Sequence, residues 1–210
     1  MLDESQNRYE LPASISLNIL TSHAVKFGLL GWEVFTGIPA SLGGAIYMNA
    51  GTSLGEIGEL VESVEVLGVS GEIRTEKINK RSFSYRENHF IKEGEVILSA
   101  VLIHKGIDQS NSKKIKDYLE LRKKTQPLTT RNCGCVFKNY DDSHRAGQFI
   151  DVCGFKGFSL NGLGVSPVHA NFVENNDRAS TEDFIELSNS LKYQLEVFSG
   201  IRFELEAKVY

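Results

Sequence analysis

The sequence predicts an α+β fold made of two domains. Three observations support this prediction: an early helical pattern that ends at a glycine, several β-branched stretches in the first half, and an amphipathic helical pattern near the C-terminus. The 210 residues are enough to bury a core and fit one domain or two small ones. A polar stretch marks the boundary, which gives domains of residues 1–106 and 107–210.

The first domain is expected to combine one helix with a sheet. Apolar residues recur at helical spacing over 16–27 and the pattern stops at Gly28, which predicts a short helix. β-branched alternation over 60–69, followed by a returning segment over 72–76, predicts a hairpin. A nearly continuous apolar run over 95–104 predicts a further strand.

The second domain is expected to begin with a helix and to end with a strand. A basic amphipathic helix is predicted over 113–125, and Pro127 prevents it from continuing. The last helix has Ser180 as its N-cap and stops at Gly200. The other expected elements are a short helix over 146–152, short strands within 158–173 and a final strand over 201–209.

Composition narrows the class of protein. The net charge of −4 argues against a general binder of nucleic acid or membrane surfaces and leaves room for a local basic pocket. Cys133, Cys135 and Cys153 form no disulfide framework, and Cys-x-Cys lacks the second ligand pair of a zinc site, so we expect no metal. A polar N-terminus without a signal peptide or membrane-spanning run predicts a reduced, cytoplasmic protein.

The segment Gly37–Gly51 is unusually rich in glycine. Glycine permits positive φ and close backbone approach, and Pro39 suits the first turn of a helix. The segment therefore predicts a loop whose amides open at a helix N-terminus, where a phosphate or a flavin edge binds. A plain tight turn into a buried helix explains the same residues.

Three polar residues stand out from the pattern of a simple fold. Arg86, beside Tyr85, can pair with a carboxylate, although a surface arginine is the commoner case. Cys135, after Gly134, can donate a proton or act as a nucleophile, and a buried inert cysteine is the alternative. Glu206 lies near the end of the last predicted strand, where a solvated glutamate is the ordinary interpretation.

The order of these motifs along the chain resembles that of the UDP-N-acetylenolpyruvoylglucosamine reductase family. The resemblance covers roughly residues 16–210, and it depends on the ordered series rather than on any one motif. The series comprises Gly37-Ile-Pro-x-x-x-Gly-Gly-Ala-x-Tyr-Met-Asn-Ala-Gly51, Tyr85-Arg86, Gln126-Pro127, Gly134-Cys-Val-Phe-Lys-Asn139, Ala146-Gly147-x-x-Ile150, Gly154-x-Lys-Gly157, Val165-Ser-x-x-His-Ala-Asn-Phe172 and Glu206.

The resemblance implies an oxidoreductase. Enzymes of this family use FAD to pass hydride from NADPH to UDP-N-acetylglucosamine enolpyruvate, and the product is UDP-N-acetylmuramate for peptidoglycan. It also implies the fold: residues 1–106 are then the second half of a two-part FAD-binding domain like that of vanillyl-alcohol oxidase, and residues 107–210 an α+β substrate-binding domain.

The resemblance assigns three catalytic roles. Arg86 stabilises the substrate carboxylate as charge builds, and Glu206, if protonated, shares in that stabilisation. Cys135 stands where most members carry a proton-donating serine, and a thiol can donate from the same position. The short interval between Arg86 and Cys135 indicates the subtype that lacks an extra substrate loop.

The remaining site residues are also implied by the resemblance. The cofactor-binding residues are Gly37, Ile38, Pro39, Gly43, Gly44, Ala45, Asn49 and Gly51. The substrate-binding residues, which contact a UDP-sugar, are Tyr85, Lys138, Asn139, His169 and Asn171.

Several positions depart from the family pattern. Ala40 replaces a loop glycine, Asn88 stands where serine is common after the Tyr-Arg pair, and Arg131-Asn132 replaces Pro-Ser. Family members begin with a βα subdomain that carries a Gly-x-Gly-Ser-Asn pyrophosphate loop, and this sequence has no such motif. We therefore expect an N-terminal FAD subdomain that is missing or supplied by another polypeptide. The alternative is a non-catalytic remnant that binds a UDP-sugar or a partner.

Overall fold

The structure, a computed structural model, describes residues 7–209 of a chain that forms two compact units. Unit 1 comprises residues 1–120 and unit 2 residues 121–210, and each is described by itself. The division falls within helix α3 (Asn111–Thr125), later than the boundary predicted after residue 106. It falls there because Asn111 and Ile115, on the first half of α3, are buried in unit 1.

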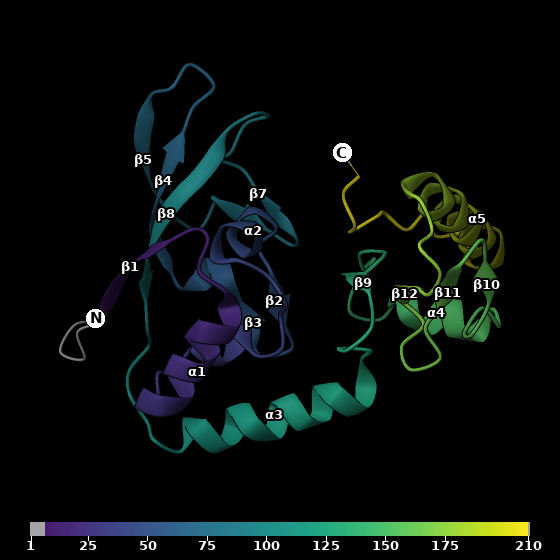
Figure 1. Cartoon of the computed structure of the whole chain (residues 1–210), viewed down its shortest axis with the longest axis horizontal. Helices are drawn as coiled ribbons and strands as arrows, with labels where there is room; N and C mark the ends of the chain where they lie inside the picture. The colour runs from purple at the N-terminus through teal and green to yellow at the C-terminus, as the bar shows by residue number, and fades with distance from the viewer. Residues whose placement is uncertain (1–6, 210) are drawn as a thin grey trace. The chain divides into compact units, whose positions relative to one another are not determined.

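A four-stranded antiparallel sheet forms the frame of unit 1 (Figure 1). Its order is β1-β8-β4-β5, so β8 pairs with a strand on each side. The predicted hairpin and third strand are confirmed, and β1 is a strand that the sequence analysis missed. The bounds are β1 (Arg8–Pro12), β4 (Val61–Leu67), β5 (Ile73–Lys77) and β8 (Val96–Ile103).

Helix α1 (Leu17–Phe27) begins and ends as predicted. The Ser16 side chain accepts a hydrogen bond from the Asn18 amide, and Gly28 closes the helix in the left-handed conformation at φ 69°. A Cβ at Gly28 would lie 2.5 Å from the Asp108 carbonyl oxygen. Both backbone conformation and space therefore require glycine here.

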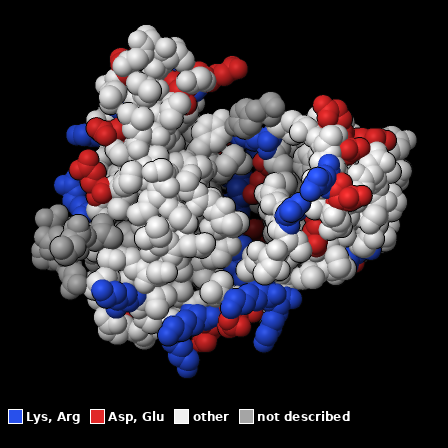
Figure 2. Space-filling model, in the orientation of Figure 1, with Lys and Arg blue, Asp and Glu red and all other residues white. Residues whose placement is uncertain are grey.

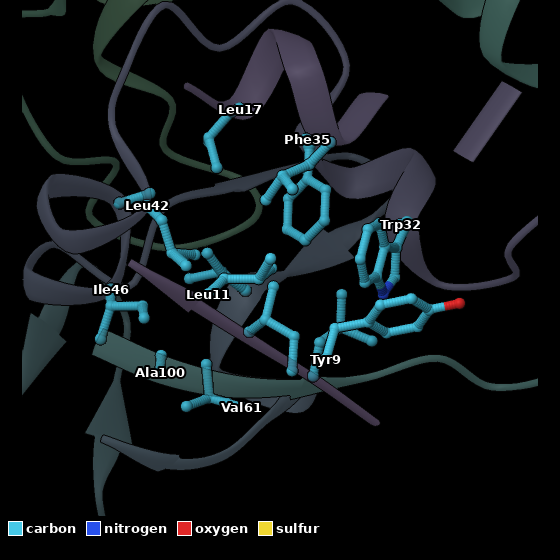
Figure 3. Close-up of a cluster of buried hydrophobic side chains, with 14 of the residues drawn as sticks. Tyr9, Leu11, Leu17, Trp32, Phe35, Leu42, Ile46, Val61 and Ala100 are labelled. Carbon is cyan, nitrogen blue, oxygen red and sulfur yellow. The ribbon is translucent and has the colours of Figure 1, made fainter. Parts of the chain in front are cut away.

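The core of unit 1 lies between α1, the sheet and two short helices (Figure 3). These are η1 (Trp32–Phe35) and α2 (Leu42–Tyr47), and both contribute fully buried side chains. Trp32 packs edge-on against Tyr9 and donates its indole N–H to the Ile103 carbonyl at 2.9 Å. Its polar atom is thus satisfied inside an apolar cluster.

Four two-residue strands and one helical turn shape the edge of unit 1. They form the hairpins β2-β3 and β6-β7, and the second hairpin turns at Tyr85-Arg86. Their bounds are β2 (Gly51–Thr52), β3 (Gly55–Glu56), η2 (Ile57–Glu59), β6 (Phe83–Ser84) and β7 (Glu87–Asn88).

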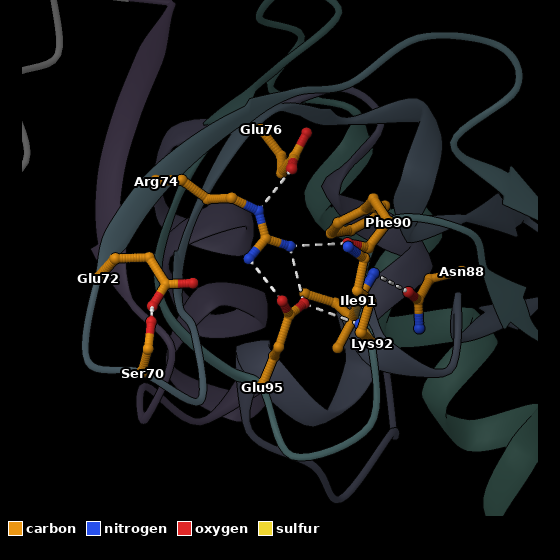
Figure 4. Close-up of polar contacts among 9 residues, drawn as sticks. All are labelled: Ser70, Glu72, Arg74, Glu76, Asn88, Phe90, Ile91, Lys92 and Glu95. Atoms are coloured by element: carbon orange, nitrogen blue, oxygen red, sulfur yellow. Dashed lines mark hydrogen bonds and ion pairs between the residues drawn. The ribbon is translucent and has the colours of Figure 1, made fainter.

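Arg74 links β5 to the segment that leads into β8 (Figure 4). Its guanidinium contacts both Glu95 carboxylate oxygens at 2.7 Å, Glu76 at 2.7 Å and the Phe90 carbonyl at 3.0 Å. Bidentate pairing of this kind is stronger and more directional than an ordinary surface ion pair.

Unit 2 packs two helices on a second antiparallel sheet of order β10-β11-β12-β9. Its last helix is closed by a capping box between Ser180 and Asp183 and by Gly200, as its sequence predicts. Leu187, Leu191 and Leu195 form its buried face. The bounds are β9 (Asn132–Cys135), α4 (Ala146–Val152), β10 (Ser159–Leu160), β11 (Leu163–Val165), β12 (Phe172–Asn175) and α5 (Thr181–Ser199).

The predicted final strand over 201–209 is wrong. The segment is irregular apart from an isolated bridge between Leu205 and Phe137. The Glu206 amide donates to the Val136 carbonyl at 2.8 Å, and the Lys138 amide donates to the Glu204 carbonyl at 2.8 Å. The segment pairs with the chain just after β9, and this stretch is too short to form a continuous ladder.

The surface charge of the chain is mixed (Figure 2). Basic side chains gather along α3, whose sequence contains Lys113, Lys114, Lys116, Arg122, Lys123 and Lys124. Within residues 7–209, no helix is long and apolar enough to cross a membrane.

Candidate functional site

Arg86 occupies the turn of the β6-β7 hairpin, in a backbone conformation that is uncommon for arginine. Its φ is 58°, in the left-handed region, which costs a residue with a Cβ roughly 1–2 kcal/mol. The guanidinium carbon lies 4.8 Å from the centre of the Tyr85 ring, and Nη2 donates to the Gly51 carbonyl at 3.0 Å. The arginine side chain is 16% exposed, so most of it is packed against the protein and little of it is in contact with solvent.

The glycine-rich segment folds differently from its prediction. Four amides at the N-terminus of α2 already have partners inside the protein: Leu42 donates to Ile15, Gly43 to Ala13, and Gly44 and Ala45 to Ser41. The expectation that these amides open toward a phosphate is therefore wrong. The Leu42 and Gly43 amides join α2 to the segment before α1, and the other two bond to the Ser41 cap.

Two glycines of this segment are required by packing of the chain on itself. A Cβ at Gly43 would lie 2.8 Å from that of Ala13, and a Cβ at Gly51 would lie 3.0 Å from Nη1 of Arg86. Gly44, in contrast, is exposed, and only the Ser41 hydroxyl oxygen approaches its Cβ position, at 3.4 Å. The backbone that a cofactor could approach is therefore that of Gly37–Pro39, Gly44 and Gly51, whereas Gly43, Ala45 and Asn49 are buried.

Asn49 joins the glycine-rich segment to the arginine hairpin. It is 1% exposed and has φ 42°. Its amide nitrogen donates to Glu56 at 2.7 Å and to the Ser84 carbonyl at 2.9 Å, and its oxygen accepts from the Gly58 amide at 3.1 Å. These internal bonds give Asn49 a structural role, and its contact with a cofactor stays a prediction.

In unit 2, the structure brings the segment that contains Cys135 next to Glu206. Cys135 ends β9 opposite Phe172, and the following residue, Val136, accepts hydrogen bonds from the amides of Glu206 and Ala207. Cys135 and Glu206 are both half-buried. The structure thus holds an acid-capable thiol and a carboxylate on paired backbone segments.

The buried side chain of Asn171 anchors this strand. Its oxygen accepts from the Phe137 amide at 3.0 Å and its nitrogen donates to the Phe137 carbonyl at 2.8 Å. Lys138 pairs with Glu204 at 3.3 Å, and the Asn139 oxygen accepts from the first amide of α4 at 3.1 Å. These contacts order the predicted substrate-binding residues, and contact with substrate stays a prediction for each.

Cys133 lies close in sequence to Cys135 but in a different environment. It lines a cavity of about 580 Å³ bounded by β9, β12, the start of α5 and the C-terminal segment, and Cys135 does not line that cavity. Desolvation, with a smaller effect of the Glu206 charge, raises the pKa of the Cys133 thiol. Cys133 therefore remains protonated at neutral pH and is a poor nucleophile.

His169 has a pKa below its ordinary value because it is buried, and the charge of Lys156 adds to the effect. Its Nδ1 accepts a hydrogen bond from the Asn171 amide at 3.3 Å, and its ring packs on Phe172 at 4.8 Å. The imidazole is therefore neutral at neutral pH and acts there as an acceptor.

This lowered pKa predicts a loss of stability in acid. Below about pH 6.5 the unfolded histidine binds a proton that the folded His169 resists, so stability falls as the pH drops toward the folded pKa. We expect His169→Gln to lose less stability than the wild type between about pH 7.5 and pH 5.5 in urea unfolding. His144→Gln is the control in the same unit, because the His144 side chain is 43% exposed and contacts Asp141 at 2.9 Å. An equal acid loss in His169→Gln and wild type would contradict this prediction.

Comparison with known proteins identifies the family. A family model described as UDP-N-acetylenolpyruvoylglucosamine reductase, C-terminal domain, matches residues 126–210. A UDP-N-acetylenolpyruvoylglucosamine reductase of Streptococcus pneumoniae (strain CGSP14) is 35% identical over 208 residues, which cover 98% of this chain and 69% of that protein. The chain belongs to this reductase family.

Other reductases of the family match as well. The reductase of Chlamydia pneumoniae is 37% identical over 204 residues, covering 96% of this chain and 66% of that protein. The crystal structure of UDP-N-acetylenolpyruvylglucosamine reductase (MurB) from Thermus caldophilus superposes with a TM-score of 0.85 at 30% identity, covering 100% of this chain and 74% of that one. The family resemblance and the α+β fold are thereby confirmed. The chain spans about two thirds of the length of the curated reductases it matches.

The sequence analysis missed one charged residue beside Arg86, Glu56. It lies in β3 and contacts both Asn49 and Arg86. Its position five residues after the glycine-rich segment was the available signal. That position alone is a weak signal, because the local sequence does not distinguish a glutamate with buried partners from a solvent-exposed glutamate.

Proposed function

We propose that this chain carries the flavin-dependent reduction of UDP-N-acetylglucosamine enolpyruvate to UDP-N-acetylmuramate, with NADPH, in the cytoplasmic synthesis of peptidoglycan precursors. The observation that supports this most directly is its identity of 35–37% with proteins named as this reductase. A second support is chemical. Arg86, Cys135 and Glu206 supply a fixed cation, a proton donor and a carboxylate, which a binding module does not need.

The cofactor implied by the family is FAD, and unit 1 corresponds in this proposal to the second half of a two-part FAD-binding domain. The residues that would hold it are the accessible ones of the predicted set, Gly37, Ile38, Pro39, Gly44 and Gly51. The space over Gly44 fits the close approach of a flat ring, because only the Ser41 hydroxyl oxygen comes near its Cβ position, at 3.4 Å. A bound flavin supplies the hydride that adds to C3 of the enolpyruvyl group.

Residues of this chain stabilise the charge that develops on the substrate carboxylate and supply the proton that C2 receives. Arg86 stabilises the carboxylate as hydride addition drives electrons into it, and its fixed position adds no reorganisation at that moment. Cys135 gives its proton to C2, which completes the addition of hydrogen across the double bond. Glu206, if protonated, donates a hydrogen bond to the same developing charge.

The substrate side chains in this proposal are those that remain accessible. Tyr85 is 43% exposed beside Arg86, and Asn139 is exposed next to α4. Lys138 and the neutral His169 provide a cation and an acceptor for the UDP-sugar, and Asn171 supports them from within. The family's N-terminal FAD subdomain, whether on the same or another polypeptide, is the partner that this proposal requires.

The proposed function predicts two changes in the visible spectrum of the protein. With the N-terminal FAD subdomain present, we expect added FAD to bind, anaerobic NADPH to bleach it, and UDP-N-acetylglucosamine enolpyruvate to restore the colour. UDP-N-acetylglucosamine is the control, because it has no double bond to reduce. A protein that binds the UDP-sugar yet binds no flavin would contradict the proposal and support the non-catalytic alternative.

A further inference from the structure

Glu56 connects two parts of unit 1 that the proposed reaction uses. Its Oε2 accepts a hydrogen bond from the Asn49 side chain at 2.7 Å, and its Oε1 lies 3.5 Å from Nη1 of Arg86. Asn49 belongs to the glycine-rich segment and Arg86 to the β6-β7 hairpin, so the two carboxylate oxygens serve two different segments. One side chain therefore ties the arginine to the predicted cofactor loop.

The ion-pair partner described for Glu56 is Arg86. Glu56 lines a cavity of about 240 Å³ together with Glu33 and Glu59. Glu33 pairs with Lys114 at 2.8 Å, and Glu59 pairs with Lys105 at 2.5 Å. Each of these two neighbouring carboxylates thus has a lysine of its own, and the ion pair found for Glu56 is with Arg86.

An arginine at this position needs such a partner. Its side chain has many rotamers, and its backbone already holds a left-handed conformation. The Gly51 carbonyl and the Tyr85 ring restrain the guanidinium from two sides, and Glu56 restrains Nη1. The three groups together fix the direction in which the cation faces.

We propose that Glu56 is the positioning residue of Arg86 for reduction of the enolpyruvyl substrate. The inference rests on the proposed function and adds to it a residue that the sequence did not indicate. Glu56 holds the guanidinium in the orientation that meets the substrate carboxylate and does not itself touch the substrate.

Replacing Glu56 by glutamine separates its two contacts. The amide has one acceptor oxygen, so it can accept from Asn49 or from Arg86 but not from both. The shorter contact, to Asn49, is the stronger one and is retained. The amide nitrogen then faces the guanidinium, donor against donor, and only the restraint on Arg86 is lost.

The test compares the two half-reactions of the flavin-loaded protein in stopped flow. We expect Glu56→Gln to slow reoxidation by UDP-N-acetylglucosamine enolpyruvate by roughly tenfold and to leave reduction by NADPH unchanged, because Arg86 acts on the second substrate alone. Glu59→Gln, the matched change on the same cavity wall, keeps both rates. In an Arg86→Ala background, Glu56→Gln causes no further loss. Wild-type reoxidation in Glu56→Gln, or an equal fall in both half-reactions, would overturn the inference.

A second measurement does not depend on activity. In the NMR spectrum of the protein, we expect the guanidinium Nη signals of Arg86, assigned by their loss in Arg86→Lys, to be resolved in the wild type and in Glu59→Gln. In Glu56→Gln the Nη1 signals should shift and broaden, because Nη1 loses its carboxylate acceptor while Nη2 keeps the Gly51 carbonyl. Unchanged signals would overturn the inference even in an active protein. An inactive wild type with this change in signals would refute the proposed function and leave the contact between Glu56 and Arg86 established.

Discussion

Replacing Arg86 with alanine is expected to slow reoxidation of the reduced protein by the enolpyruvyl substrate by roughly 10²–10³-fold, the usual cost of losing one preorganised charge-stabilising group. The guanidinium is held by Gly51, Glu56 and Tyr85, so it is in place before charge develops. The measurement is the rate of flavin reoxidation under a single turnover. Reduction by NADPH should be unaffected.

The matched control for this change is Arg81→Ala. Arg81 is an exposed arginine five residues earlier, and its described hydrogen bond comes from its backbone amide. Its removal should leave both half-reactions at the wild-type rate. The role of Arg86 would be refuted by an alanine variant that folds, binds flavin and reoxidises as fast as the wild type.

Replacing Cys135 with alanine is expected to have an effect of similar size on the same step. A general acid contributes typically about 10²–10⁴-fold, and alanine has no proton to give. Cys135→Ser should retain appreciable activity, because a hydroxyl on the same Cβ can donate to C2. Steady-state turnover and single-turnover reoxidation both measure this difference.

The neighbouring cysteine provides a sharp control for that experiment. Cys133 lines a cavity that Cys135 does not line, and its pKa is raised by desolvation, so Cys133→Ala should leave turnover unchanged. Turnover by Cys135→Ala equal to that of the wild type would remove the proton-donor role. A loss in Cys133→Ala equal to that in Cys135→Ala would indicate a disturbance of β9 rather than of proton transfer.

The elements that the sequence predicted well are those whose ends are set by local physics. Ser16 and Gly28 close α1, and Ser180 and Gly200 close α5, because a side-chain acceptor and a left-handed glycine satisfy free backbone groups at any helix end. The order of motifs along the chain likewise indicated the family, since it depends on sequence alone.

The features that the sequence could not predict depend on distant partners. The final segment alternates like a strand, yet it finds only residues 136–138 to pair with. The first amides of α2 were expected to be open, and the carbonyls of Ala13 and Ile15, from before α1, accept two of them. Glu56 and Arg86 are separated by 30 positions in the sequence, so their contact exists only after the two hairpins are placed.

The central position of β8 has a consequence for the synthesis of the protein. Each of the three other strands of the sheet precedes β8 in the chain. Both β1 and β4 form antiparallel hydrogen-bonded pairs with β8. While the ribosome is still making residues 96–103, β1 has no edge to join, and the Tyr9 and Leu11 side chains have no completed sheet to pack on. The first unit therefore closes late, after β8 and the first half of α3 have emerged from the exit tunnel, and the pairing of β1 with β8 contributes long loops that slow that closure.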